Sequence, residues 1–398
     1  MRNLSLIIIL SFILFFELEL KAQCCVWFPR KECDTLNLEI ERQFCWLNLF
    51  ATQQLKINPD TVEFYKNYYA GESEVYLKGK HTPWGCDYFQ WDSGGIARRW
   101  QPSNKIKLIK DTAQLKWDKV LKMNQQELSL LSPSEKLDIY LGNKDFRITK
   151  TEIVKRGFLR LRPTHNDGFC NGIRAAGALT PEPIRPITVI SKDKIKLTFY
   201  PADLKGLAGA SYFHLEDSGY GQIGCPSNFA NECDPNPAVF DLSLRLILGY
   251  NKTAFFIDTS KNSMIYNKTI LGYSRRIAGM ASSISNDGKV HATVDVVTTL
   301  YCLSDLNISE SNKATKEIIA DKNNVRKYKK WFRVYEFSYT LNLNDKKIVS
   351  GNWTSKAPDF IWFATGIGAD NLQPFNSSNA NQYLDYNEII KLINLSAK

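Results

Sequence analysis

The spacing of hydrophobic side chains changes along the chain, from helical spacing in the first part to strand-like runs in the second. Ile40, Phe44 and Leu47 recur on one face of a helix. Further on, Ser132 followed by a proline predicts the start of another helix, with Ser132 as its N-cap and Glu135 completing a capping box. The first part of the chain therefore predicts helices.

The second half carries strand-like runs rich in β-branched and aromatic residues. They span residues 194–200, 240–249, 253–259, 290–302 and 333–343. The last run alternates apolar and polar side chains, meets a turn at Asn344-Asp345 and returns in IVSGNW, so it predicts a hairpin. Helices followed by strands favour an α+β fold.

The N-terminus has the pattern of a secretory signal peptide. An apolar run from Leu4 to Phe16 follows one basic residue, and residues 1–23 end in a short polar stretch. The run is shorter than the roughly 20 residues that a membrane span needs, and Glu17 and Glu19 follow it, so cleavage is favoured over anchoring. No later segment is apolar enough to span a membrane. We therefore expect a secreted protein, extracellular or periplasmic.

The composition indicates a folded, basic protein. Hydrophobic residues make up 44% of the chain, enough to fill a core, and the net charge is +10. This charge favours anionic surfaces or acidic proteins as partners, although the Lys and Arg residues are spread along the chain. The dense basic stretch 325–333 comes without a recognised nucleic-acid motif, so no nucleic-acid binding is predicted.

All nine cysteines lie beyond the predicted signal peptide. Export permits disulfides, and an odd number leaves at least one thiol unpaired within the chain. Cys225 and Cys233 enclose a loop short enough for a local bridge, and the four cysteines between residues 24 and 45 can bridge among themselves. A lipid anchor on Cys24 is the alternative for the first of them, but Gln23 is a poor residue before a lipidated cysteine.

Cys170 stands where a helix is expected to begin, in NDGFCNGIRAAG. A helix N-terminus lowers a cysteine pKa by placing partial positive charge beside the sulfur, and its free N–H groups can stabilise an oxyanion. Gly168 allows the sharp turn before it, and the small residues after it let the helix lie close to its neighbours. Cys170 is therefore either a nucleophile or, as for most such cysteines in exported proteins, a paired or buried residue.

Five stretches of the chain, in this order, resemble segments of the transglutaminase elicitor family, secreted enzymes first associated with oomycete cell walls and also found in bacteria. They are PWGCDYFQWDSGGIARRW, LSPSEKLDIYLGNKDFRITKTE, NDGFCNGIRAAGALTPEP, DPNPAVFDLSLRLILGYNKTAFFIDTSKNSMIYN and YTLNLNDKKIVSGNWTSKAPDFIWF. Together they run from about Pro83 to Phe363. No single stretch is specific, but five in the right order indicate the family.

The resemblance implies a papain-like transglutaminase core, with a central nucleophile helix packed on an antiparallel sheet. In the reaction it implies, a cysteine thiolate attacks a glutamine carboxamide, releases ammonia and passes the acyl group to a lysine amine or to water. A base activates the thiol and a third group orients the base. Carried over residue by residue, the nucleophile is Cys170, the orienting aspartate is Asp258 and the histidine position is Asp241. The implied partners are proteins or peptides that carry glutamine and lysine.

The aspartate at the histidine position is the main departure from the family pattern. A carboxylate beside the cysteine would raise the thiol pKa and would be a poor acid for the leaving amine. If Asp241 and Asp258 lie on neighbouring strands, a shared proton would recover some acid function. Of the other histidines, His165 and His214 reach the site only if their loops fold back, and His291 begins a later strand.

Two smaller features bear on the site. Ile173 stands where the family usually has tryptophan. Calcium is the cofactor that the resemblance suggests, because some relatives depend on it. The sequence has no EF-hand loop, so a calcium site would be assembled from scattered oxygens. Four histidines, none near a cysteine pair, give no zinc spacing.

These observations predict four segments and leave three functions open. The segments are the signal peptide 1–23, a cysteine-rich segment 24–80, a transglutaminase-like domain 81–370 and a loosely held polar tail 371–398. The protein is an active exported transglutaminase, a catalytically degenerate member that binds protein in the former cleft, or a disulfide-stabilised adhesion protein. The third function predicts Cys170 in a bridge.

Overall fold

A computed structural model describes most of the chain after the predicted signal peptide. The described residues are 33, 35–67, 72–100, 115–156, 167–213, 220–224, 234–259, 265–320, 332–345, 347–364 and 381–398. The predicted signal peptide, Cys24 and the pair Cys225 and Cys233 lie outside these ranges. Within them, no helix has the length and the apolar character that crossing a membrane requires.

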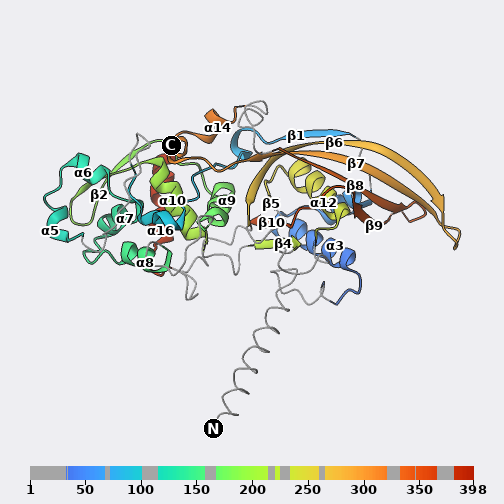
Figure 1. The fold of residues 1–398 in the computed structure, drawn as a ribbon, viewed down its shortest axis with the longest axis horizontal. Helices are drawn as coiled ribbons and strands as arrows, with labels where there is room; N and C mark the ends of the chain where they lie inside the picture. Colours follow the sequence, from blue (N-terminus) through green and yellow to red (C-terminus); the bar gives the residue numbers. More distant parts are fainter. Residues whose placement is uncertain are drawn as a thin grey trace, which may run out of the picture.

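Two parts make up the fold, a cluster of helices and a long curved sheet (Figure 1). Within the helical part, α9 lies on the side that faces the sheet. The helical part contains α5 (Trp117–Val120), α6 (Gln125–Ser129), α7 (Pro133–Leu141), α8 (Arg147–Arg156), α9 (Cys170–Leu179), α10 (Pro201–Phe213), α16 (Tyr386–Ala397) and the hairpin of β2 (Ile187–Ile190) and β3 (Lys196–Phe199). The loop 81–100 packs into this part through short 3-10 turns and buries Trp84, Phe89 and Trp100.

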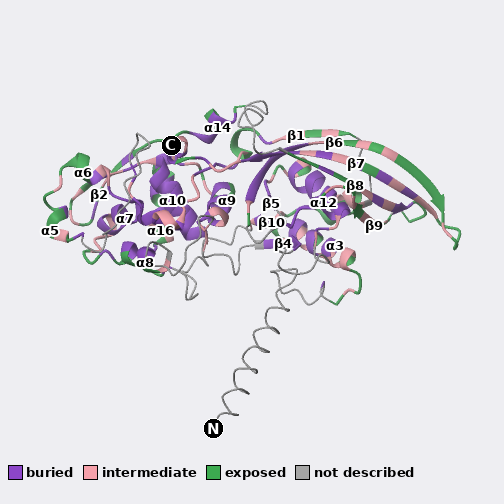
Figure 2. Cartoon of the chain, viewed as in Figure 1, coloured by how far each residue is buried: buried purple, intermediate pink, exposed green. Residues whose placement is uncertain are grey.

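The sheet contains eight described strands, all paired antiparallel. Its order is β4 (Tyr220–Gly224), β10 (Phe360–Ala364), β5 (Phe256–Asp258), β6 (Asn267–Ile284), β7 (Val290–Leu303), β8 (Phe332–Asn342) and β9 (Lys347–Trp353). Off this path, β1 (Ser73–Tyr76) pairs with residues 272–275 of β6. Figure 2 shows the outer half of β6 exposed and its inner end buried. Mixed helices with an antiparallel sheet confirm the predicted α+β class.

A second group of helices fills the concave side of the sheet. It consists of α3 (Glu39–Leu49), α4 (Pro59–Asn67) and α12 (Pro237–Ser243), and α12 continues as a π-helical segment over Leu244–Tyr250. Phe44 and Leu47 of α3 lie in the same hydrophobic core as Phe240 of α12. The cysteine-rich segment is therefore packed into the sheet, and a disulfide joins Cys33 to Cys45 within it.

Local sequence signals account for several of these elements. The helix predicted around Ile40, Phe44 and Leu47 is confirmed as α3. At the start of α7, the Ser132 side chain accepts from the Glu135 backbone N–H and the Glu135 side chain accepts from that of Ser132, which confirms the capping box. The strands expected over 290–302 and 333–343 are β7 and β8, and β8 returns as β9 in the expected hairpin.

The strand expected over 240–249 is wrong, because this stretch is helical. Asn236 caps α12 by accepting from the Ala238 backbone N–H at 3.0 Å, and Pro237 occupies the first turn. Every residue from Pro237 to Leu248 is buried. A helix buried on all sides is apolar all round, so its sequence shows no helical period and is easily taken for a strand.

The loosely held tail expected over 371–398 is also corrected for its described part, 381–398. Asp385 caps α16 by accepting from the Glu388 backbone N–H at 3.1 Å. Ile389, Leu392 and Ile393 are fully buried in the core of the helical part. The C-terminal segment is thus a structural helix and not a polar tail.

The packing of α9 is set by backbone contact with α10. A Cβ on Gly172 would lie 1.9 Å from the Gly209 carbonyl oxygen, and a Cβ on Gly209 would lie 2.2 Å from Ile173 Cδ1. Only glycine at both positions permits this approach. Ile173 fills the space left by Gly209, which leaves no room there for the tryptophan that the family usually carries.

We predict that α16 contributes directly to global stability. Ile389→Ala removes a fully buried side chain and should lower the free energy of unfolding by about 2–4 kcal/mol. Leu395→Ala, on the same helix but 46% exposed, should change it by less than about 0.5 kcal/mol. Urea unfolding of both variants measures the difference, and equal effects would contradict the packing of this helix.

Candidate functional site

Cys170 is the first residue of α9, is half-buried as a residue and carries a free thiol. The turn before it is held by the Phe169 backbone N–H, which donates to the Tyr88 carbonyl at 2.7 Å. A Cβ on Gly168 would lie 2.6 Å from that same carbonyl oxygen, so glycine is required here. Since the thiol is free, the prediction of a bridged Cys170 is wrong.

Asn267, the first residue of β6, faces Cys170. The Trp362 indole N–H donates to Asn267 Oδ1 at 2.7 Å, inside the protein. An indole N–H can only donate, so the amide oxygen must face Trp362 and the amide NH₂ must face the other way. That NH₂ donates to Asn171 Oδ1, and the Asn267 side chain also hydrogen-bonds the Cys170 sulfur. A fixed hydrogen-bond donor therefore points at the thiol.

Asp258 lies directly opposite Asn267 in the ladder between β5 and β6. Phe256 packs into the core of the helical part and Ile257 into the core around α12. Because side chains alternate along a strand, Asp258 faces the same side as Phe256, which is the side of α9. Its Oδ1 accepts from the Tyr266 backbone N–H at 3.1 Å, and its side chain is fully buried. The ladder thus places Asp258 beside Asn267, the residue that contacts Cys170.

A buried group of charges lies beside this row. Arg174, one turn after Cys170, donates from Nε to the Asn267 carbonyl at 3.3 Å and pairs with Asp305 through Nη2. Lys268 Nζ donates to the other oxygen of Asp305 at 2.8 Å. Burial alone would raise the pKa of the Asp305 carboxyl, but the two cations hold it below its usual value. Asp305 is therefore ionised at neutral pH.

The thiol of Cys170 is not activated by these surroundings. Burial of the sulfur among protein atoms, together with the charge of Asp305, raises its pKa to about 11. Arg174 and the hydrogen bond from Asn267 oppose this rise without cancelling it. With a pKa of about 11, the thiol is protonated at neutral pH.

Asp241 lies elsewhere, on α12 in the core on the concave side of the sheet. Its carboxylate accepts from Arg275 Nε at 2.6 Å and from Arg245 Nε at 3.0 Å, and Arg275 also donates to the Tyr339 hydroxyl at 3.1 Å. Burial would raise the pKa of Asp241, but the two guanidinium groups hold it below its usual value. The expectation that Asp241 and Asp258 occupy neighbouring strands is wrong, because Asp241 is on a helix.

The histidines do not complete the site within the described residues. His165 and His214 lie outside the described ranges. His291 is at the start of β7, opposite Ser283, whereas the end of β7 lies near Asn267. His81 is exposed in the 3-10 turn Gly79–His81. In the part of the chain that the structure describes, no three His, Cys, Asp or Glu side chains gather to hold a metal, so the calcium expectation has no ligand set there.

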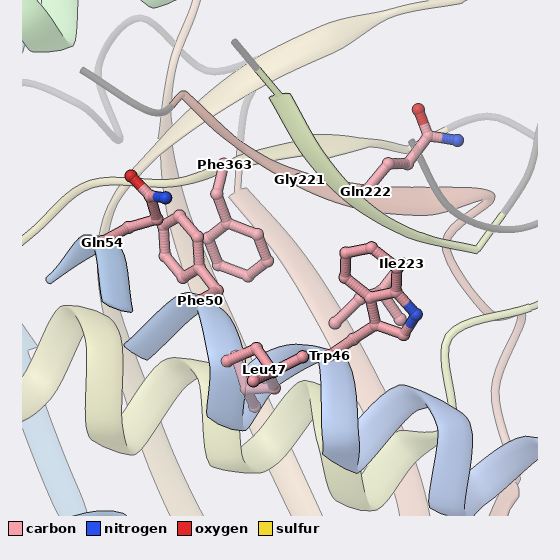
Figure 3. Close-up of a pocket in the computed structure, with 9 residues that line it drawn as sticks. Trp46, Leu47, Phe50, Gln54, Gly221, Gln222, Ile223 and Phe363 are labelled. Carbon is pink, nitrogen blue, oxygen red and sulfur yellow. The ribbon is translucent and has the colours of Figure 1, made fainter. Parts of the chain in front are cut away.

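A small apolar hollow lies on the far side of the sheet from α9. Figure 3 shows Trp46, Leu47 and Phe50 of the first helical segment facing Ile223 and Phe363 across it. The Phe50 and Phe363 rings pack with centroids 4.5 Å apart. No charged side chain lines the hollow, so it offers nothing for acyl-transfer chemistry.

Sequence reasoning missed Asn267. The family-like stretch that ends in MIYN contains it, but an asparagine gives no signal of reactivity in a sequence. Only the register of β5 with β6, and the indole of Trp362 from a distant strand, reveal its position.

We predict that the Cys170 thiol has a raised pKa, of about 11. Since only the thiolate reacts, the rate of iodoacetamide labelling at Cys170 should rise about tenfold per pH unit from about pH 7 to about pH 10. Mass spectrometry of the labelled peptide measures it, and circular dichroism at each pH confirms that the protein stays folded. Cys302, buried with a pKa of about 12, is the slow internal reference. A rate that levels off below about pH 8 would contradict the assignment.

We predict that Asp241 is a structural residue. Asp241→Asn leaves two buried guanidinium groups without a counter-charge and should lower the free energy of unfolding by about 3–5 kcal/mol. The rate of Cys170 labelling at fixed pH should stay within about twofold of wild type while the variant is folded. Denaturant unfolding and labelling are measured on one preparation; slower or faster labelling by tenfold would place Asp241 in the site.

Comparisons with known proteins agree with the resemblance seen in the sequence. The family model described as transglutaminase elicitor matches residues 162–398. The fold is similar to the crystal structure of the GP42 transglutaminase from Phytophthora sojae, with a TM-score of 0.52 and 16% sequence identity over 87% of this chain and 98% of that one. No curated protein sequence matches significantly. Because the family match covers more than half of the chain, the protein belongs to the transglutaminase elicitor family.

Proposed function

We propose that the protein transfers an acyl group from a protein-bound glutamine to a primary amine or to water through Cys170. One observation carries this proposal: a free thiol at the start of α9 faces an amide donor, Asn267, whose orientation is fixed by Trp362. The family is the second support. The structural likeness to GP42 supports the fold alone.

The chemistry assigns a role to each group near the sulfur. Cys170 Sγ forms a bond to the glutamine carboxamide carbon, the C–N bond breaks, and the thiol proton leaves with ammonia. The backbone N–H groups at the start of α9 are donors for the oxyanion that forms on the carbonyl oxygen. The Asn267 N–H that bonds the sulfur is a further donor once the sulfur is bonded to carbon and releases it. Asp258 lies next to Asn267 in the ladder and keeps this end of the sheet in place.

The proton carrier is not among the groups shown to contact the sulfur. Asn171 and Asn267 are amides, which neither take up nor release a proton near neutral pH. Asp241 is occupied by Arg245 and Arg275. The reaction therefore depends on a proton acceptor beyond these contacts, or proceeds through the small thiolate fraction that a pKa of about 11 leaves at neutral pH.

The second candidate function is protein binding without catalysis. The raised pKa of Cys170 and the structural engagement of Asp241 favour it, because both remove thiol activation that the family reaction requires. In this case a protein that the family would use as a substrate is instead bound, without reaction, at the surface around Cys170.

Export of the protein fits either candidate. The disulfide between Cys33 and Cys45 is compatible with an oxidising compartment. We propose that residues 1–23 are removed as a signal peptide and that the remainder acts outside the cytoplasm.

We predict that amine incorporation separates the two candidates. Wild-type protein should attach a fluorescent primary amine to a glutamine-rich protein, and Cys170→Ala should abolish this. Asn267→Ala removes one oxyanion donor and should lower kcat by about 100-fold with a smaller change in KM. Cys302→Ala, at a buried thiol in another core, is the matched control and should retain activity.

The outcomes are distinct. If folded wild-type protein neither incorporates the amine nor releases ammonia from glutamine over a range of pH up to about 10, acyl transfer is overturned and binding is the candidate function that is left. If Asn267→Ala keeps full kcat, the donor role of Asn267 is overturned while Cys170 remains.

A further inference from the structure

A groove of about 600 Å³ opens at the far end of α9 from Cys170. Its walls come from the turn 79–84, the last turn of α9 with residues 180–182, the loop 252–254 and α14 (Thr315–Ile318). The lining begins at Gly177, seven residues after Cys170, so the groove starts about 10 Å from Cys170 along the helix. A volume of this size accommodates a ligand of several residues or rings.

The groove is positively charged. Lys80, Lys252 and Lys316 line it, and all three are exposed. Their positions come from three separate elements, so the fold gathers charge that is dispersed in the sequence. A concave wall of one charge raises the local concentration of ligands of the opposite charge.

The one carboxylate among the described side chains that line the groove does not offset this charge. Glu182 Oε1 accepts from Lys205 Nζ at 2.7 Å and from the Thr315 backbone N–H at 2.7 Å and hydroxyl at 2.6 Å. Lys205 is fully buried. Glu182 therefore serves to neutralise Lys205 inside the protein, and the lysines at the opening keep their net positive charge.

The lining also contains aliphatic side chains beside its polar ones. Leu179, Pro181 and Ala254 form part of the lining. The one tryptophan of the described lining, Trp84, is only 2% exposed and lies under Lys205, whose Nζ is 5.7 Å from the ring centroid. Among the described lining residues, only the imidazole of His81 is left as an exposed ring, which is fewer than the successive rings that stack a single-stranded nucleic acid.

We propose that this groove binds an acidic segment of a polypeptide, with Asp or Glu carboxylates on Lys80, Lys252 and Lys316 and small apolar side chains against Leu179 and Pro181. Exposed lysines and aliphatic side chains in one groove match a chain that carries both acidic and small apolar residues. The groove is a site separate from Cys170, so the proposal does not depend on acyl transfer.

The test is fluorescence anisotropy with a fluorescein-labelled peptide of alternating glutamate and alanine. Wild-type protein should bind it, and Lys80→Glu/Lys252→Glu/Lys316→Glu should weaken binding by about tenfold or more, because three attractions become repulsions. Raising the salt from about 50 to about 200 mM should weaken wild-type binding more than that of this triple variant.

The matched control carries the same change of charge away from the groove. Lys119→Glu/Lys122→Glu/Lys150→Glu reverses three exposed lysines of the helical part and should change affinity by less than about threefold. Cys170→Ala should bind as wild type does, which separates this result from any failure of the proposed catalysis. Circular dichroism confirms that each variant is folded.

Three results would overturn the proposal. Equal weakening in the two triple variants would show attraction to the net charge alone. Equal binding of an alternating lysine and alanine peptide would remove charge as the basis of recognition. Displacement of the peptide by an oligonucleotide or an acidic oligosaccharide at a lower concentration than by unlabelled peptide would identify a different class of ligand.

Discussion

Backbone contact between α9 and α10 is the constraint on which the site depends. The two helices approach so closely that neither Gly172 nor Gly209 has space for a Cβ. At its other end α9 is equally tight, because a Cβ on Gly177 would lie 2.3 Å from the Trp84 carbonyl oxygen. A helix held at both ends cannot slide, so Cys170 is fixed against the end of β6 where Asn267 begins.

The same close packing raises the pKa of the thiol. Contact with the sheet and with Asn267 surrounds the Cys170 sulfur with protein, and burial disfavours its charged form. The charge of Arg174 lowers the pKa of the thiol. However, Arg174 is paired with Asp305, which also pairs with Lys268 and whose own charge raises the pKa of the thiol. Positioning and activation therefore oppose each other at this cysteine: the packing that orients the sulfur also keeps it protonated.

Sequence reasoning succeeded where local signals decide the structure and failed where tertiary burial does. The capping box at Ser132 and the hairpin after β8 depend on neighbouring residues, so they were predictable. The structures of the stretch 240–249 and of the helix α16 were not predicted. Uniform burial erases the helical period in the first, and the Asn- and Ser-rich sequence before α16 led to the prediction of a loose tail for the second. Cys170 was singled out by the family resemblance added to a weak local turn signal, and both can be read from the sequence. Asn267 depends on strand register and on a distant indole, neither of which a sequence displays.

Asp241 shows how position in a family pattern and position in space can differ. The match of NPAVFD placed it at the base, but its carboxylate satisfies Arg245 on its own helix and Arg275 on β6. Two buried guanidinium groups need a counter-charge, and a carboxylate between them joins α12 to the sheet. A histidine there could not replace both of these bonds. Asp241 is therefore explained by the stability of the concave core, and the groups that surround the Cys170 thiol come from the α9 side of the sheet.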